Sequence, residues 1–373
     1  MKFSCLSNEL SSALLNTSKV VANRSTLEVM EGILLDVEPD SICVVGYNFD
    51  IAITTSISAK VEEEGKLVLS AKLFTEIIRR MPEGVINFES TQDLHLKITC
   101  NNMEFDIVGM EAQTYPDLPT VDTEHTVKMN AEKFRDLVSK TIYAASTDET
   151  KLIYTGALIN FEAQKITMVA LDGFRMAVKE MAIESEVEAS VICPSRSLQE
   201  VIRLITNPDQ EILIDVSNTY MMFRVNNYTI IAKLLEGRFL DYKATITKKF
   251  STQIVVKTQE IIESIERTAV VVQNKLKAPI MLTIEDKKLK MACRSTTGAA
   301  SDEIACSTNG EPLVISFNSR LLLEALRAAN CEEVNLNFSG SLTPAIIHSA
   351  AAEDDFLFLV LPVRNLNQDT ESE

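Results

Sequence analysis

The stretch Lys72-Leu73-Phe74-Thr75-Glu76-Ile77-Ile78-Arg79 decides the fold, because stretches of the same pattern return twice further along the chain. The second is Arg196-Ser197-Leu198-Gln199-Glu200-Val201-Ile202-Arg203, and the third is Arg320-Leu321-Leu322-Leu323-Glu324-Ala325-Leu326-Arg327. Each copy reads basic, any, apolar, any, Glu, apolar, apolar, Arg, and successive copies begin 124 residues apart. Because three such periods span almost all of the 373 residues, the sequence predicts one domain repeated three times.

Each copy has the spacing of an amphipathic helix. In the first, Phe74, Ile77, Ile78 and Met81 fall at i, i+3, i+4 and i+7. The two basic residues of a copy are seven apart, so they lie two turns apart on one face, and the Glu between them can pair with either. A second helix is predicted around Leu10 and Leu14, with counterparts 124 residues later and, shifted by three residues, around Ile261 and Ile265.

Short alternating stretches, typical of strands, lie between the helices of each period. Examples are Ile42–Val45, Ile51–Ile57 and Leu94–Thr99. Strands and helices in this order predict an α+β fold with the helices on one face of the sheets. We expect domains at 1–123, 124–249 and 250–365, followed by a flexible acidic tail at 366–373.

The composition is that of a globular protein, with 46% hydrophobic and 24% charged residues. The start lacks the apolar core of a signal peptide, and the longest apolar run, Phe356 to Leu361, reads as a buried strand, so we expect a cytoplasmic protein. Seven cysteines form no C-x-x-C pair and three histidines are far apart, so we expect buried thiols, no metal site and no cofactor.

The charge is unevenly placed. The net charge of −17 alone argues against contact with nucleic acid. However, the predicted helical segments 7–24, 71–81, 130–143, 194–206, 258–277 and 318–329 hold 15 Lys or Arg and 9 Asp or Glu, while the remainder carries a net charge of −23. For one helix, a solvated basic face with no partner is the simpler interpretation. Because the same basic pair recurs three times in an otherwise acidic chain, we expect these helical faces to bind an anionic partner.

Four motifs then resemble the bacterial beta sliding clamp family, the beta subunits of DNA polymerase III, over nearly the full chain. Ala170-Leu171-Asp172-Gly173-Phe174-Arg175-Met176-Ala177 resembles A-T-D-G-H-R-L-A. Leu235-Glu236-Gly237-Arg238-Phe239-Leu240-Asp241-Tyr242 resembles L-E-G-x-F-P-D-Y, and Phe358-Leu359-Val360-Leu361-Pro362-Val363-Arg364 resembles Y-x-V-M-P-M-R. A weaker match is Gly109 to Pro119.

The resemblance implies three clamp domains per chain and a head-to-tail homodimer that closes a ring around duplex DNA, with helices on the inner face and sheets outside. Sequence-blind phosphate contacts suit a protein that slides. Family DNA contacts map onto Arg24, Arg79, Arg80, Lys151 and Arg196. The repeat adds Lys72, Arg203, Arg320 and Arg327, and Lys133 and Lys140 are seven apart in the same way. The resemblance also implies a processivity factor without catalytic residues.

The resemblance further implies an apolar pocket between the second and third domains. It takes a short peptide, a Gln followed by Leu and Phe, from the polymerase, the clamp loader and repair proteins. The matching positions are Tyr154, Leu171, Gly173, Phe174, Arg175, Met176, Leu240, Val360, Leu361, Pro362, Val363 and Arg364. Phe174, Leu240 and Tyr154 depart from the family's frequent residues towards bulkier or more apolar ones. The subunit interface maps to Phe105 and Ile107 on an edge strand, opposite Val271 and Val272.

Two other classes of function fit the sequence less well. An enzyme would need a phosphate loop, a nucleophile elbow or a metal cluster, and the sequence has no G-x-x-x-x-G-K-[ST], G-x-S-x-G or H-E-x-x-H motif. Asp172-Gly173 reads better as a tight turn than as a catalytic acid. A scaffold that binds only proteins would keep the repeats and the pocket, but it would leave the basic helical faces without a use.

Overall fold

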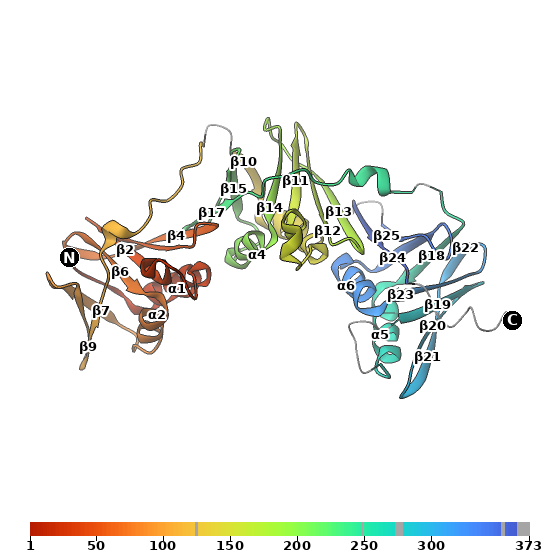
Figure 1. The fold of residues 1–373 in the computed structure, drawn as a ribbon, viewed down its shortest axis with the longest axis horizontal. Coiled ribbons are helices and arrows are strands. Elements are labelled where there is room, and N and C mark those ends of the chain that lie inside the picture. Colours follow the sequence, from red (N-terminus) through yellow and green to blue (C-terminus); the bar gives the residue numbers. More distant parts are fainter. Residues whose placement is uncertain (124–125, 248, 273–278, 352–354, 364–373) are drawn as a thin grey trace. The chain divides into compact units, whose positions relative to one another are not determined.

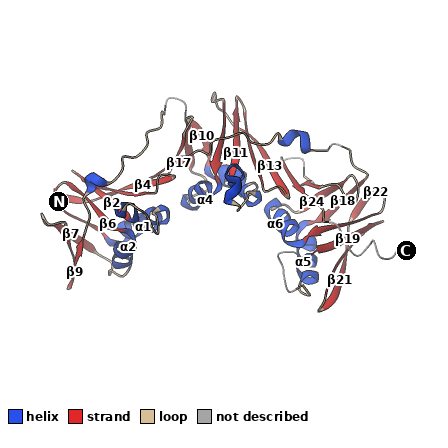
Figure 2. Cartoon of the chain, in the orientation of Figure 1, coloured by secondary structure: helices blue, strands red, loops and turns tan. Residues whose placement is uncertain are grey.

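The computed structural model describes residues 1–373 except 124–125, 248, 273–278, 352–354 and 364–373. The predicted tail at 366–373 and Arg364 therefore lie outside the described residues. The chain divides into two compact units. Unit 1 comprises Met1–Phe134 and Arg196–Leu234, and unit 2 comprises Arg135–Ser195 and Leu235–Glu373. Figure 1 labels the elements along the chain, and Figure 2 separates helices from strands.

The elements follow the period of 124 residues. The first repeat contains β1 (Lys2–Leu6), α1 (Ser7–Thr17), β2 (Gly32–Glu38), β3 (Ser41–Tyr47), β4 (Ile51–Ser58), β5 (Lys60–Glu63), β6 (Gly65–Ser70), α2 (Ala71–Arg79), β7 (Val85–Ser90), β8 (His95–Cys100) and β9 (Met103–Val108). The second contains β10 (Val127–Asn130), α3 (Ala131–Ser139), β11 (Gly156–Glu162), β12 (Lys165–Leu171), β13 (Arg175–Ala182), β14 (Ala189–Pro194), α4 (Ser195–Leu204), β15 (Glu211–Val216), β16 (Tyr220–Val225) and β17 (Tyr228–Lys233). Strands β11 to β14 begin and end 124 residues after β2, β3, β4 and β6.

The third repeat has the same order. It contains β18 (Thr252–Lys257), α5 (Thr258–Ala269), β19 (Pro279–Glu285), β20 (Lys288–Ser295), β21 (Gly298–Ala305), β22 (Ser307–Gly310), β23 (Leu313–Asn318), α6 (Ser319–Ala329), β24 (Glu333–Phe338), β25 (Ala345–Ser349) and β26 (Phe356–Val360). The α+β prediction and the six helix positions are confirmed, although each helix is shorter than its predicted segment. Short 3-10 turns connect several elements, including Ser18–Val20 and Glu149–Thr155.

Sheets join strands from different repeats. In unit 1, an eight-stranded sheet has the order β10-β15-β16-β17-β4-β3-β2-β6, in which β17 of the second repeat pairs with β4 of the first. In unit 2, a nine-stranded sheet has the order β14-β11-β12-β13-β26-β25-β24-β18-β22, in which β13 pairs with β26 of the third repeat. Backbone hydrogen bonds between β17 and β4 and between β13 and β26 therefore join neighbouring repeats into one sheet. The domain boundaries given above remain a prediction.

The helices pack their apolar faces onto these sheets. In unit 1, Leu10 and Leu14 of α1 and Phe74 and Ile78 of α2 are buried in one cluster with residues of the two sheets. In unit 2, Ile261 and Ile265 of α5 and Leu322 and Leu326 of α6 are buried. In each of these helices, the side that the apolar spacing predicts to be buried is the side that packs into the core.

The polar faces carry the repeated charges outward. Helices α2, α4 and α6 each expose the basic residues at the two ends of their motif. No helix among the described residues is long and apolar enough to cross a membrane. The seven cysteines are free thiols, and burial raises the pKa of Cys5 to about 12, so this thiol stays protonated and poorly nucleophilic at neutral pH.

Candidate functional site

The exposed cations on the repeated helices and in the segments beside them are the first candidate functional residues, and each unit carries its own set. In unit 1, Lys72 at the start of α2 and Arg196 at the start of α4 are exposed, as is Arg24 in the segment after α1. In unit 2, Lys151 and Arg320 are exposed. In the part of the chain that the structure describes, Arg24, Lys72, Lys151 and Arg196 form no ion pair.

The remaining predicted cations pair with carboxylates. Glu76 binds both Arg79 (2.8 Å) and Arg80 (2.6 Å) on α2, and hydrogen bonds from these two guanidinium groups lower the pKa of Glu76. On α4, Arg203 binds the buried Glu200 at 2.5 Å. The positive charge of these arginines is thus partly balanced within the chain. The cations predicted to contact DNA therefore include some with a carboxylate partner and some without.

The third copy of the motif is paired in a different way. On α6, Arg320 binds Glu324 at 3.0 Å, whereas Arg327 binds Glu266 of α5. A hollow lies between these two helices, lined by Glu266, Ala269, Val270, Ser319, Arg320, Leu323, Glu324 and Arg327. Both arginines at its rim are therefore neutralised locally by glutamates of unit 2.

The prediction for Lys140 is wrong. Its side chain is buried, contacts Asp136 at 3.1 Å and lies over the ring of Phe356. Lys179 of β13 reaches the same carboxylate at 3.5 Å. Lys140 therefore belongs to the interior, although Lys133 on the same helix is exposed as expected. Spacing alone did not separate the two, because helix α3 ends at Ser139.

The second candidate site is an apolar surface of unit 2, which we call the outer cluster. It contains the buried side chains of Leu158, Val169, Leu171, Met176, Val178, Ile192, Tyr242 and Leu359. Tyr154 and Leu361 are half-buried and pack against it, as do Ile153, Leu235, Phe239, Ile246 and Leu357, which sequence reasoning missed. Tyr154 also contacts Phe239 edge-on at 5.6 Å.

Exposed apolar residues border this cluster. Phe174 is 64% exposed, and Leu240 and Val363 are exposed as well. Leu240 lines a hollow of about 450 Å³ together with Leu158, Ile192, Phe239 and Tyr242, four residues that also belong to the cluster or pack on it. Large apolar side chains that remain in solvent beside a packed apolar surface are typical of a site for a partner.

A tight turn presents Phe174. Asp172 Oδ1 accepts hydrogen bonds from the backbone N–H groups of Phe174 (2.8 Å) and Arg175 (3.0 Å), and Gly173 has a φ of +92°. Leu361 N–H donates to the Phe174 carbonyl at 2.9 Å, which joins the turn to the end of β26. The interpretation of Asp172-Gly173 as a turn is confirmed, because its carboxylate is occupied by these bonds and by Arg175.

Not all predicted pocket residues lie on this surface. Arg175 and Val360 are direct cross-strand partners and so share one face of the sheet, whereas Met176 and Leu359, also partners, share the other. Val360 is fully buried, and β26 packs against α6. Val360 therefore lies behind the outer cluster, where it supports the sheet. Pro362 follows the strand and bridges to Phe317, as suits a residue without an N–H group.

Of the residues predicted for the subunit interface, two lie on a strand at the edge of a sheet. Strand β9 is the edge of the five-stranded sheet β5-β1-β7-β8-β9. Phe105 is half-buried, but Ile107 is only 9% exposed and belongs to the core of unit 1, so Ile107 offers little surface. Val108 of the same strand is exposed. Val271 and Val272 are half-buried and follow α5 rather than lying on a strand.

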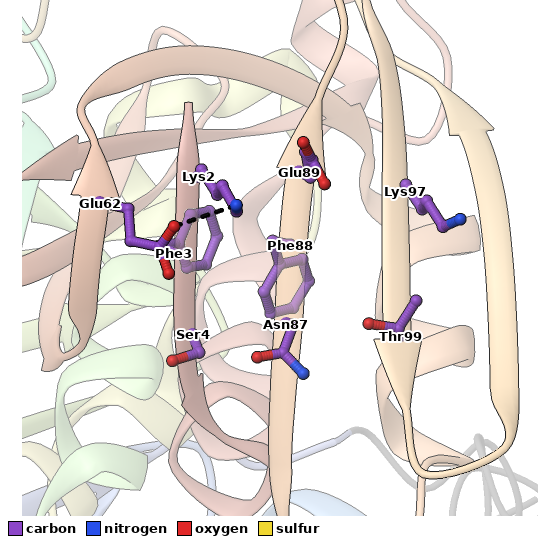
Figure 3. Close-up of a pocket in the computed structure, with 9 residues that line it drawn as sticks. All are labelled: Lys2, Phe3, Ser4, Glu62, Asn87, Phe88, Glu89, Lys97 and Thr99. Atoms are coloured by element: carbon purple, nitrogen blue, oxygen red, sulfur yellow. Dashed lines mark ion pairs between the residues drawn. The ribbon is translucent and has the colours of Figure 1, made fainter.

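A polar hollow on the same sheet of unit 1 has a different character (Figure 3). Lys2, Glu62, Glu89 and Lys97 line it. Lys2 binds Glu62 at 3.0 Å, and Lys97 binds Glu104 at 2.9 Å. Its cations are therefore paired with carboxylates. Among the described residues, no group of three or more His, Cys, Asp or Glu side chains is placed to hold a metal ion.

Known proteins of one family match this chain over nearly its full length. Models of the N-terminal, central and C-terminal domains of the DNA polymerase III beta subunit match residues 1–119, 128–241 and 243–364. The beta sliding clamp of Bacillus subtilis is 26% identical over 98% of this chain and 100% of its own length. That of Halalkalibacterium halodurans is 27% identical, over 94% of this chain and 96% of the relative.

Solved structures agree over the same length. The DNA polymerase sliding clamp of Bacillus subtilis has a TM-score of 0.94 at 25% identity and covers 98% of this chain and 99% of its own. The DNA polymerase III beta chain of Streptococcus pneumoniae has a TM-score of 0.92 at 25% identity, with 98% and 100% covered. The chain therefore belongs to the family of DNA polymerase III beta subunits, the beta sliding clamps, which are accessory processivity factors and not catalytic subunits.

Proposed function

We propose that this DNA sliding clamp works as a head-to-tail homodimer that encircles duplex DNA and tethers the replicative polymerase through the outer cluster. A ring-shaped dimer is characteristic of the family to which the chain belongs. The site of action that follows is the bacterial nucleoid within the cytoplasm. The observation that supports the proposal most is the threefold recurrence of exposed basic residues on helices of an otherwise acidic chain.

Duplex DNA is held by the exposed cations at Arg24, Lys72, Arg79, Arg80, Lys151, Arg196, Arg203, Arg320 and Arg327. These are Lys and Arg side chains on helices and short turns, and such side chains attract phosphates without reading sequence. Glutamates already balance Arg79, Arg80, Arg203, Arg320 and Arg327, so each of these gives a weak contact. Weak and interchangeable contacts permit sliding.

Partner peptides bind at the outer cluster. Phe174, Leu240 and Val363 are exposed apolar residues beside the half-buried Tyr154 and Leu361, which suits the Leu and Phe side chains of a short anchor peptide. The polymerase catalytic subunit, the clamp loader and repair proteins would supply such peptides. Because Phe174 stands on a turn fixed by Asp172, its backbone is held in place before a peptide arrives, which lowers the entropic cost of binding.

The dimer closes through the exposed edge of β9. An unpaired edge strand offers N–H and C=O groups to a second strand, and Phe105 and Val108 add apolar side chains to that contact. Light scattering should give a mass of about twice 41.4 kDa. Phe105→Asp should shift the mass towards the monomer, while Phe49→Asp, at an exposed residue far from β9 in sequence, should not. A monomer mass for the unaltered chain would contradict the proposed ring.

A further inference from the structure

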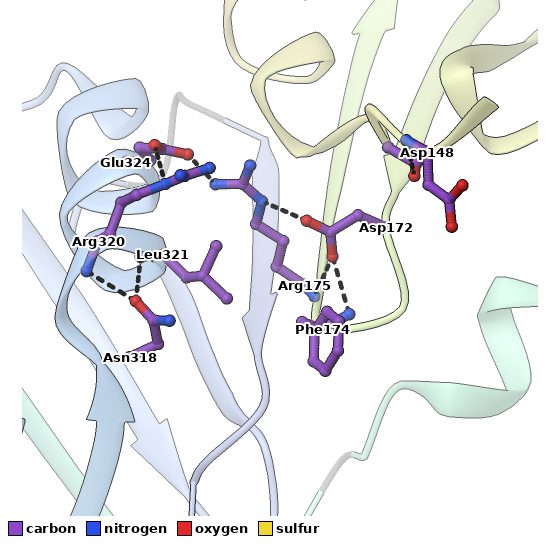
Figure 4. Close-up of polar contacts among 9 residues, drawn as sticks. Asp148, Asp172, Phe174, Arg175, Asn318, Arg320, Leu321 and Glu324 are labelled. Carbon is purple, nitrogen blue, oxygen red and sulfur yellow. Dashed lines mark hydrogen bonds and ion pairs between the residues drawn. The ribbon is translucent and has the colours of Figure 1, made fainter. Parts of the chain in front are cut away.

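The repeated glutamate is used differently in the three copies of the motif. Glu76 pairs with Arg79 and Arg80, and Glu200 pairs with Arg203, so both bind arginines of their own helix. Glu324 binds Arg320 of its own helix through Oε1 and Arg175 of β13 through Oε2 (Figure 4). Among the described residues, Glu324 is therefore the one copy that reaches from its helix into another repeat.

Arg175 is a buried cation with two anionic partners. Its side chain is 6% exposed, and its guanidinium lies over the ring of Tyr143 at 5.3 Å. Arg175 Nε donates to Asp172 Oδ2 at 3.0 Å, and Nη1 donates to Glu324. A buried charge is tolerated only when it is paired and hydrogen-bonded, so the loss of either carboxylate would loosen the side chain.

The same arginine fixes the turn at the outer cluster. Asp172 uses one carboxylate oxygen for Arg175 Nε and the other for the backbone N–H groups of Phe174 and Arg175. Figure 4 shows Arg175 standing between Asp172 and Glu324, with Phe174 on the turn beside them. The chain of contacts therefore runs from Glu324 through Arg175 and Asp172 to the backbone of Phe174, whose side chain is exposed.

We infer that Glu324 is a positioning residue for the peptide site and that it links this site to the DNA-facing cation Arg320. This inference rests on the proposed function. Arg320 and Arg175 share one carboxylate, so a phosphate that draws Arg320 away leaves Glu324 to Arg175 alone. The turn is then held more firmly, and peptide binding tightens. Linkage requires the reverse as well, namely that bound peptide strengthens the contact with duplex DNA.

The chain contains no tryptophan, so Phe174→Trp places a single tryptophan at the turn, whose emission can be excited apart from that of the tyrosines. In this background, a synthetic peptide with Gln followed by Leu and Phe is titrated with and without a short DNA duplex. A labelled copy of the peptide, followed by anisotropy, tests the chain with Phe174 in place. Glu324→Gln should weaken peptide binding about tenfold, because a hydrogen bond to a charged group is lost. It should also lower the anisotropy of the emission from the introduced tryptophan.

Glu76→Gln is the matched control, since it removes the same charge from the equivalent position of the first repeat and should leave peptide affinity unchanged. Glu324→Asp keeps the charge and should restore part of the affinity. Added duplex should tighten peptide binding about two- to fivefold in the unaltered chain and have no such effect in Glu324→Gln.

The outcomes separate the two ideas. If the unaltered chain binds the peptide and Glu324→Gln binds it equally well, the positioning role is wrong. If duplex leaves the affinity of the unaltered chain unchanged, the link through Arg320 is wrong. If the unaltered chain does not bind the peptide, the proposed function itself fails. Should Glu324→Gln not fold by circular dichroism, Arg320→Gln replaces it: without duplex this variant should bind the peptide about as tightly as the unaltered chain does with duplex, and duplex should tighten it no further. A retained effect of duplex would refute the link.

Discussion

Asn48 and Asp172, which are 124 residues apart, form the same turn in successive repeats. Asn48 Oδ1 accepts from the N–H groups of Asp50 (3.1 Å) and Ile51 (2.9 Å), as Asp172 Oδ1 does from the two residues at the same offsets. The residue after each has positive φ, namely Phe49 at +70° and Gly173 at +92°. The difference is that Ile51 stands where the second repeat has Arg175. The first turn is therefore built without the ion pair that links the second to α6.

The pair of turns gives a test of what each bond contributes. Asp172→Ala removes two backbone hydrogen bonds and one anion beside Arg175, so we expect the free energy of unfolding to fall by about 2–4 kcal/mol and peptide binding to weaken strongly. Asp172→Asn keeps the turn and loses the ion pair, and its affinity should lie between. Urea unfolding and peptide titration measure the two quantities.

Asn48→Ala serves as the control for that experiment. It opens the equivalent turn in the first repeat, so it should lower stability while leaving peptide affinity at the outer cluster intact. A loss of peptide binding in Asn48→Ala would mean that general destabilisation, and not the turn at Asp172, explains the result.

The unpaired and paired cations should differ in their effect on DNA. Arg196 and Arg203 are exposed on the same helix, but Arg203 binds Glu200. Arg196→Gln should reduce the slope of log affinity against log salt by up to about 0.9, the value for one phosphate contact, and Arg203→Gln should reduce it less. A short fluorescent duplex titrated over a salt series gives both slopes. Equal slopes in the two variants would count against the distinction.

A buried ion pair should stabilise unit 1. Asp215 is completely buried and accepts from Arg224 at 2.9 Å. Arg224→Met leaves that carboxylate with Thr126 alone, and because Arg224 is partly exposed we expect a loss of about 2–4 kcal/mol, near the lower limit for broken buried pairs. Lys97→Met, which breaks the exposed pair with Glu104, should cost less than about 1 kcal/mol. Urea unfolding of both variants decides whether burial makes the difference.

His348 should make the protein less stable in mild acid. Burial lowers the pKa of His348, and its Nδ1 contacts the Phe356 carbonyl at 3.2 Å. A histidine with a lowered pKa favours the folded state above its unfolded pKa of about 6.5, and that contribution is lost as pH falls towards the folded pKa. Between pH 7.5 and 5, the melting temperature of the unaltered chain should therefore fall more than that of His348→Gln. If the melting temperatures of the two proteins fell equally with pH, His348 would not be the cause of the acid sensitivity.

The sequence predicted the helices and strands better than it predicted which other segments they pack against. The period of 124 residues and the apolar spacing located all six helices and the strands that flank α2, α4 and α6, because local periodicity reflects which side of an element is buried. The motif around Asp172 also predicted the turn correctly, since Asp-Gly is a strong local signal. These features depend on residues that are close together in the chain.

What the sequence did not predict depends on distant pairing. Strand β26 is apolar on both faces, so the sequence did not show which face carries the outer cluster: Leu359 belongs to it, and Val360 lies on the opposite face. Lys140 was misjudged for the same reason, because its side chain turns into a core made by other segments. The burial of Ile107 against the core of unit 1 was not visible in the sequence either, and its place in the subunit interface stays a prediction. The bond between Glu324 and Arg175 spans 149 positions of sequence, and no local pattern marks it.

The claim that the chain encircles DNA is tested most directly by retention on closed and open duplexes. The protein is placed by its clamp loader on a nicked circular plasmid and on the same plasmid cut once, and both are then passed over a sizing column in high salt. High salt removes electrostatic contacts but not a topological link. The account predicts that the protein stays on the circle and leaves the linear molecule through its ends. Equal loss from both forms would contradict it.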